Sequence, residues 1–119
     1  MELKQAVATL SALAQETRLA VFRLLVEEGP HGLPAGEIAA RLGVTPATLS
    51  FHLAQLERAE LLSSQRRSRQ IVYRVDLEGT RRLLAFLTED CCQGRPELCA
   101  ALSVGCAASR GAERPTMTS

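Results

Sequence analysis

The sequence predicts a mainly α-helical fold with one small β-hairpin, arranged as a winged helix-turn-helix. Three observations support this prediction. Apolar residues recur at helical spacing through residues 3–26. A short helix, a glycine turn and a second helix follow one another between residues 35 and 58. Two strand-like segments joined by basic residues come directly after them.

The first two helices are predicted from apolar periodicity. The first helix has apolar residues at Leu3, Val7, Leu10 and Leu13. A broader apolar stripe over residues 19–26 predicts a second helix at the centre of the core. Residues 27–30, with the sequence EEGP, close that helix. Residues 29–34 contain two glycines and two prolines, which predict a loop.

The next two helices form the predicted helix-turn-helix. A helix over Ala35–Leu42 ends at Gly43, which can adopt the left-handed conformation of a helix cap. Thr45 is suited to cap the following helix, and Pro46 is suited to its first position. The predicted buried face of this second helix consists of Leu49, Leu53 and Leu56.

A basic hairpin and a last helix complete the predicted fold. Residues 61–65 and 70–75 are strand-like, and the predicted connection between them is Arg66–Arg69. A hairpin in this position is a wing. A last helix is predicted over residues 77–88, so that residues 1–88 form the winged helix-turn-helix DNA-binding domain. Residues 89–106 are then a cysteine-containing ligand segment, and residues 107–119 are expected to be a disordered tail.

Charge is distributed unevenly along the 119 residues. The net charge is only +1, which argues against bulk attraction to nucleic acid. Between residues 41 and 74, however, six arginines stand against two glutamates. The arginines are Arg41, Arg58, Arg66, Arg67, Arg69 and Arg74, and the glutamates are Glu57 and Glu60. Such a patch can neutralise phosphates, although most runs of charge are merely a solvated face.

Neither a signal peptide nor a membrane helix is predicted. The N-terminus has the period of an amphipathic helix, and no run of 18 apolar residues occurs. We therefore expect a cytoplasmic protein without a membrane partner. An enzyme is not expected either, because the sequence shows no phosphate-binding loop, no C-x-x-C motif and no nucleophile placed beside a base.

The four cysteines all lie in the last 30 residues: Cys91, Cys92, Cys99 and Cys106. In a reducing cytosol, clustered thiols are expected to be ligands or sensors rather than disulfides. A continuous helix would separate Cys92 and Cys99 by about 10 Å along its axis. The Gly94–Pro96 break allows the chain to turn back, so that three thiolates can converge on one soft ion. Cys106 is a possible fourth ligand, and a redox couple or small apolar fillers are the alternatives.

The chain resembles the ArsR/SmtB family of bacterial metalloregulators. The resemblance lies in ETRLAVFRLL, GEIAARLGVTPATLSFHLAQLERAELL and RRSRQIVYRV, with the family-typical S-x-H-L at Ser50–Leu53. It implies a homodimer formed through the first and last helices, and a repressor that leaves its operator when a metal or metalloid binds. The helix over Ala35–Leu42 lacks the cysteines of the best-known arsenic and cadmium sensors, and no histidine follows His52 for the zinc site.

A further resemblance, of the segment DCCQGRPELC, is to arsenic-responsive members whose cysteines lie after the last helix. It implies trivalent arsenic (arsenite) as inducer, bound by Cys91, Cys92 and Cys99. Zinc or cadmium sensing, a redox-sensing repressor of the same fold, and a constitutive winged-helix DNA-binding protein stay open as alternatives.

Operator DNA is the expected double-stranded partner. Thr48, Ser50 and Gln55 are candidates for base or phosphate contacts, and Thr45 for a phosphate near the helix start. Candidates for contacts to thymine methyl groups are Pro46, Ala47 and Phe51. His52 is either a DNA contact or a half-buried packing residue. The candidate wing contacts to phosphate or the minor groove are Arg67 and Arg69.

Overall fold

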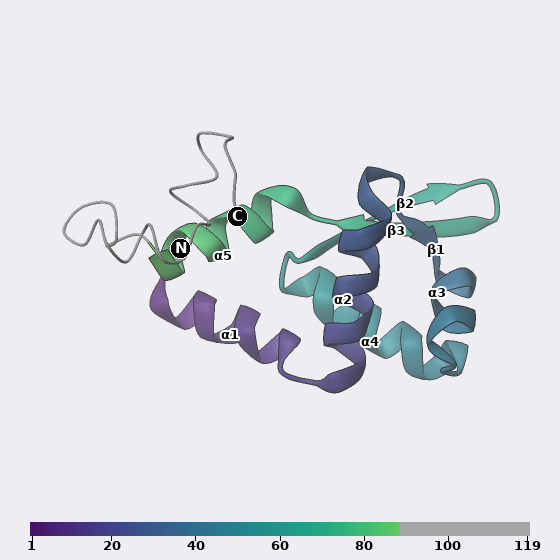
Figure 1. Cartoon of the computed structure of the whole chain (residues 1–119), viewed down its shortest axis with the longest axis horizontal. Helices are drawn as coiled ribbons and strands as arrows, with labels where there is room; N and C mark the ends of the chain where they lie inside the picture. The colour runs from purple at the N-terminus through teal and green to yellow at the C-terminus, as the bar shows by residue number, and fades with distance from the viewer. Residues whose placement is uncertain (89–119) are drawn as a thin grey trace, which may run out of the picture. The chain divides into compact units, whose positions relative to one another are not determined.

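The computed structural model describes residues 1–88. They form α1 (Leu3–Leu13), α2 (Glu16–Glu28), a 3₁₀ turn η1 (Gly29–His31), β1 (Leu33–Pro34), α3 (Ala35–Leu42), α4 (Pro46–Arg58), β2 (Leu62–Arg67), β3 (Gln70–Val75) and α5 (Leu77–Thr88). Figure 1 labels the α-helices and the strands. The predicted mainly helical winged fold is therefore confirmed. The chain forms two compact units, one over Glu2–Thr80 and the other beginning at Arg81.

The core of the first unit lies between α2, α3 and α4. Leu49, Leu53 and Leu56 of α4 are each at most 1% exposed, as the leucine spacing predicted. Val21 and Leu25 of α2 are fully buried, which confirms the predicted central position of that helix. Burial of a leucine side chain stabilises a fold by about 1.5–3 kcal/mol, so the three α4 leucines fix which side of this helix faces inward.

Local hydrogen bonds set the ends of α3 and α4. Gly43 has the left-handed φ of 68°, and its N–H donates to the Ala39 carbonyl at 2.9 Å. The Thr45 hydroxyl accepts from the backbone N–H of Thr48 at 3.2 Å, and Pro46 takes the first helical position. Both predicted caps are confirmed, and the turn between α3 and α4 is therefore defined by residues close in the sequence.

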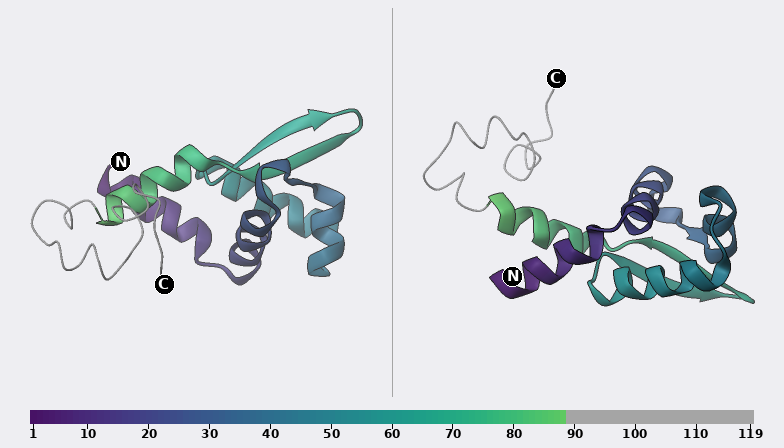
Figure 2. Two further views of the ribbon diagram at one scale, coloured as in Figure 1. Left: turned by 45° about the horizontal axis from the view of Figure 1, so that its top comes forward. Right: turned by 90° about the horizontal axis from the view of Figure 1, so that it is seen from below.

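The sheet differs in two respects from the sequence prediction. Its strand order is β1-β3-β2, and both strand pairs are antiparallel. The additional strand β1 lies within the predicted loop, where Leu33 pairs with Tyr73 and Pro34 pairs with Val72. The hairpin is also tighter than expected: Arg66 and Arg67 belong to β2, and only Ser68 and Arg69 make the turn. Ser68 takes a left-handed φ of 60° there. The hairpin extends past the helices of the same unit (Figure 2).

Gly32 makes the pairing of β1 with β3 possible. Its φ is +69°, and a Cβ placed on it would overlap the carbonyl oxygen of Tyr73. Only glycine meets both requirements, because it lacks a Cβ and tolerates positive φ. The glycine in the predicted loop thus allows the backbone to approach a strand about 40 residues later.

One guanidinium connects three helices of the first unit. Arg18 of α2 donates from Nε to the carbonyl of Ala12 in α1 at 2.6 Å, and its Nη1 lies 3.1 Å from Nδ1 of His52 in α4. Arginine has no acceptor, so Nδ1 accepts and the imidazole is neutral with its proton on Nε2. His52 is 9% exposed, and burial first and the Arg18 charge second lower its pKa.

This lowered pKa gives a test by pH. The unfolded chain takes up a proton at His52 near pH 6.5, before the folded chain does, so the free energy of unfolding should fall as the pH drops below about 6.5. His52→Asn removes the titrating group, and we expect it to flatten the decline measured by urea unfolding between about pH 7.5 and 5. Exposed His31 provides the control, because His31→Asn leaves His52 and its Arg18 contact in place and should keep the decline that His52 causes. An unchanged decline in His52→Asn would contradict the assignment.

Candidate nucleic-acid interface

The outward side of α4 presents several of the residues that the sequence nominated for DNA contacts. The helical period places Ala47 and Phe51 opposite the buried leucines. Phe51 is 59% exposed, Thr48 and Ser50 are also exposed, and Gln55 is half-buried. An exposed aromatic ring beside hydroxyl and amide groups can contact both the apolar and the polar parts of base edges.

The start of α4 has a second polar contact besides its cap. The Thr45 hydroxyl donates to the Thr48 hydroxyl at 2.9 Å, so these two predicted contact residues are already oriented by each other. Both remain exposed. Backbone N–H groups at this helix start and the positive end of the helix dipole favour an anion such as a phosphate.

A groove joins α4 to the hairpin. Its cavity measures about 420 Å³, and it brings Ser50 of α4 together with Arg69 at the hairpin turn. The other lining residues are Pro34, Ala35, Gly36, Pro46, Leu49, Leu53, Gln70, Ile71 and Tyr73. The sequence prediction missed Gln70, Ile71 and Tyr73 as parts of this surface. The alternation of side chains along a strand could have indicated Ile71 and Tyr73 together, because residues 71 and 73 share one face of β3.

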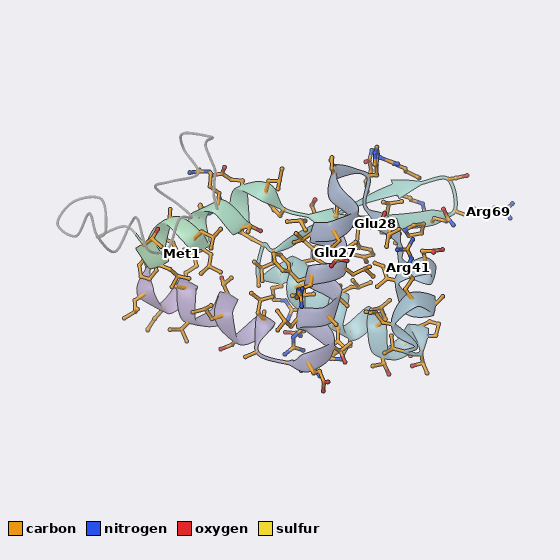
Figure 3. All side chains as sticks on the ribbon, in the orientation of Figure 1. Met1, Glu27, Glu28, Arg41 and Arg69 are labelled. Carbon is orange, nitrogen blue, oxygen red and sulfur yellow. The ribbon has the colours of Figure 1, made fainter. Side chains whose placement is uncertain are left out.

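The hairpin is a basic surface without acidic residues. Leu62–Val75 contains four arginines and neither aspartate nor glutamate. Two of the arginines, Arg67 and Arg74, donate to the neutral Oε1 of Gln65 at 3.4 Å and 3.2 Å. Arg69 lies at the hairpin tip and points away from the protein (Figure 3). These charges are therefore available to phosphate groups.

Arg41 does not belong to this basic surface, although the sequence analysis counted it there. Its guanidinium donates to Glu37 at 3.1 Å and to Glu28 at 3.0 Å, and Figure 3 shows Arg41 and Glu28 together. Hydrogen bonds to Glu37 and then to Glu28 raise the Arg41 pKa. Its charge is balanced by these two glutamates, so Arg41 does not add to the positive charge of the hairpin.

His52 points toward the core rather than outward. The side chain is buried and its Nδ1 accepts from Arg18. The Phe51 and His52 rings meet edge to face with their centres 5.5 Å apart. Of the two roles that the sequence left open for His52, this position favours packing.

The predicted metal ligands Cys91, Cys92 and Cys99, and the possible fourth ligand Cys106, lie outside the described residues. Within residues 1–88, no three histidine, cysteine, aspartate or glutamate side chains gather as a metal site. No helix in this range is long and apolar enough to cross a membrane.

A family model and two curated relatives match this chain. A family model described as a helix-turn-helix domain matches residues 13–65. The chain is 32% identical over 89 residues to the HTH-type transcriptional regulator YgaV of Escherichia coli, covering 75% of this chain and 88% of YgaV. It is 29% identical over 89 residues to the transcriptional activator HlyU of Vibrio cholerae, covering 75% and 80%. These relatives are regulators and not enzymes.

Solved structures give the same result. An ArsR-like transcriptional regulator from Rhodococcus sp. RHA1 matches with a TM-score of 0.64 and 25% identity, over 84% of this chain and 91% of that one. A possible transcriptional regulator for arsenical resistance matches with a TM-score of 0.59 and 26% identity, over 78% and 94%. HlyU solved in the reduced form matches with a TM-score of 0.56 and 28% identity, over 72% and 87%. The chain therefore belongs to the winged helix-turn-helix family of DNA-binding transcriptional regulators, with structural neighbours of the ArsR type.

Proposed function

We propose that this regulator is a homodimeric, cytosolic repressor that binds operator DNA and releases it when trivalent arsenic binds the C-terminal cysteines. The observation that supports the DNA-binding part most directly is the groove that unites Ser50 of α4 with Arg69 of the hairpin. In this arrangement α4 contacts base edges in the major groove, and the hairpin arginines contact the flanking backbone.

An exposed apolar face on α1 supports the dimer. Leu3, Val7 and Leu10 are 70%, 55% and 40% exposed, whereas the small residues Ala6 and Ala12 are buried. Soluble proteins rarely leave large aliphatic side chains together in water, so such a face marks an interaction surface. In α5, Leu84 and Leu87 are also exposed, at 39% and 52%. A symmetric dimer would present two copies of α4 to successive major grooves, and its operator would be an imperfect palindrome.

The cysteine content supports the choice of inducer. Four thiols occur within Cys91–Cys106, and soft thiolates prefer soft ions such as trivalent arsenic. The likeness to a possible regulator for arsenical resistance agrees with this chemistry. The relative HlyU has been solved in a form described as reduced. This observation favours thiol oxidation as the second candidate signal. HlyU is also an activator, which makes the sign of regulation a separate question for experiment.

The hairpin contact is tested by removing its terminal charge. Arg69→Ala should weaken binding to every DNA sequence by a similar factor and lower the slope of log K against log salt concentration by about 1, because one phosphate contact is lost. Fluorescence anisotropy over a series of salt concentrations measures both quantities. Exposed Arg23 on α2 offers the matched control, and Arg23→Ala should behave like the wild type. An unchanged slope in Arg69→Ala would place the hairpin away from the DNA.

The sensor is tested by single cysteine substitutions. Cys91→Ser, Cys92→Ser and Cys99→Ser should each abolish the arsenite-dependent loss of operator affinity and leave affinity without arsenite unchanged. In the wild type this loss should be about 5- to 150-fold, the usual range of coupling between two sites. Gel-shift titration of the reduced protein measures it, and Cys106→Ser distinguishes an essential fourth ligand from a bystander.

Two outcomes of that titration would reject arsenic sensing. One is constant operator affinity as arsenite is added to the reduced wild-type protein. The other is release by peroxide without release by arsenite, which would instead support the redox switch.

A further inference from the structure

A polar contact on each margin of α4 holds this helix within the first unit. The helical period places His52 and Leu53 on opposite margins of the buried leucine stripe, with Glu57 on the Leu53 side. On that side, Ser64 of β2 donates to the Glu57 carboxylate at 2.7 Å. On the other side, Arg18 donates to His52 at 3.1 Å.

The Arg18 contact is the more rigid of the two. The Ser64–Glu57 bond is exposed, whereas the Arg18–His52 bond is partly buried. The planar guanidinium is fixed at its other edge by the Ala12 carbonyl at 2.6 Å. The backbone N–H of Arg18 also donates to the Gln15 side chain at 2.9 Å, which holds the start of α2 in place. A guanidinium held at two edges has little freedom to follow a rotating partner.

We propose that Arg18 and His52 are positioning residues for DNA reading, because their hydrogen bond fixes the rotation of α4 about its own axis. Neither residue contacts DNA in this arrangement. Leucine packing permits small rotations, since apolar contacts have no preferred direction, but a directional hydrogen bond does not. A small rotation would displace Ser50 and Phe51 relative to the hairpin tip, and contacts to base edges depend on that placement.

The inference rests on the proposed function of α4 as the helix that reads the operator. The probe is a DNA duplex that the wild-type protein enriches from a random-sequence library, with a shuffled duplex of the same composition as reference. The quantity measured is the ratio of the two affinities. If the wild type enriches no sequence, the proposed function fails. If it does and the variants below retain the ratio, only this inference fails.

Two His52 variants separate positioning from packing. Asn places its side-chain oxygen near the position of Nδ1 and keeps an acceptor for Arg18, whereas Leu keeps apolar volume without an acceptor. At a temperature where circular dichroism shows each protein fully folded, His52→Leu should lower the affinity ratio by about tenfold, which is within the discrimination that one good base-edge contact supplies. His52→Asn should restore most of the ratio. Binding to the shuffled duplex should stay unchanged in both.

A double-mutant cycle identifies Arg18 as the partner. Arg18→Met should reproduce the loss seen in His52→Leu, and the double variant should lose no more than either single variant, because both remove the same bond. Ser64→Ala is the matched control on the opposite margin of α4. It should lower the affinity ratio less than His52→Leu does. Equal ratios in His52→Leu and the wild type, or fully additive losses in the cycle, would overturn the proposal. If Arg18→Met does not fold, the comparison of the two His52 variants still decides.

Discussion

Burial of the leucine stripe of α4 is the constraint on which the rest of the first unit depends. Leu49, Leu53 and Leu56 lose almost all contact with water, so the opposite side of the helix must face outward. That side holds the hydroxyl, amide and aromatic groups suited to DNA. Burial of these leucines also positions α4 beside the sheet. The groove between α4 and the hairpin results from this position.

Electrostatics then determine which part of the surface attracts DNA. The net charge of the chain is only +1, so no uniform attraction exists. Arg41 is paired with two glutamates, while the hairpin carries four arginines and no acidic residue. Screening over about 8 Å at physiological salt makes this local excess more important than the sum over the chain.

The chain separates its two proposed tasks along the sequence. Residues up to Thr80 hold the DNA-reading elements, and every cysteine lies beyond Thr88. A signal from the thiols would therefore have to reach elements in another unit of the chain. The apolar face of α1 is relevant here, because the carbonyl of Ala12 near the end of that helix binds the arginine that also holds α4. A change in the proposed dimer interface would have a physical route to the DNA-reading helix.

The sequence by itself determined the features that depend on neighbouring residues. Helical periodicity gave α1 to α4, and the local chemistry of Gly43, Thr45 and Pro46 gave the turn between α3 and α4. The position of the basic hairpin and the outward residues of α4 followed from the same short-range rules. The position of the four cysteines is also a property of the sequence, but their arrangement is not.

Only the tertiary structure decided which residues far apart in the chain meet. The pairing of Leu33 with Tyr73, the neutralisation of Arg41 by Glu28, and the bond from Arg18 to His52 each join segments that no local pattern connects. Each is a specific match of geometry or charge that exists only after the chain has packed. For this reason the sequence left His52 between two roles, and the burial of its ring beside a fixed guanidinium favoured one of them.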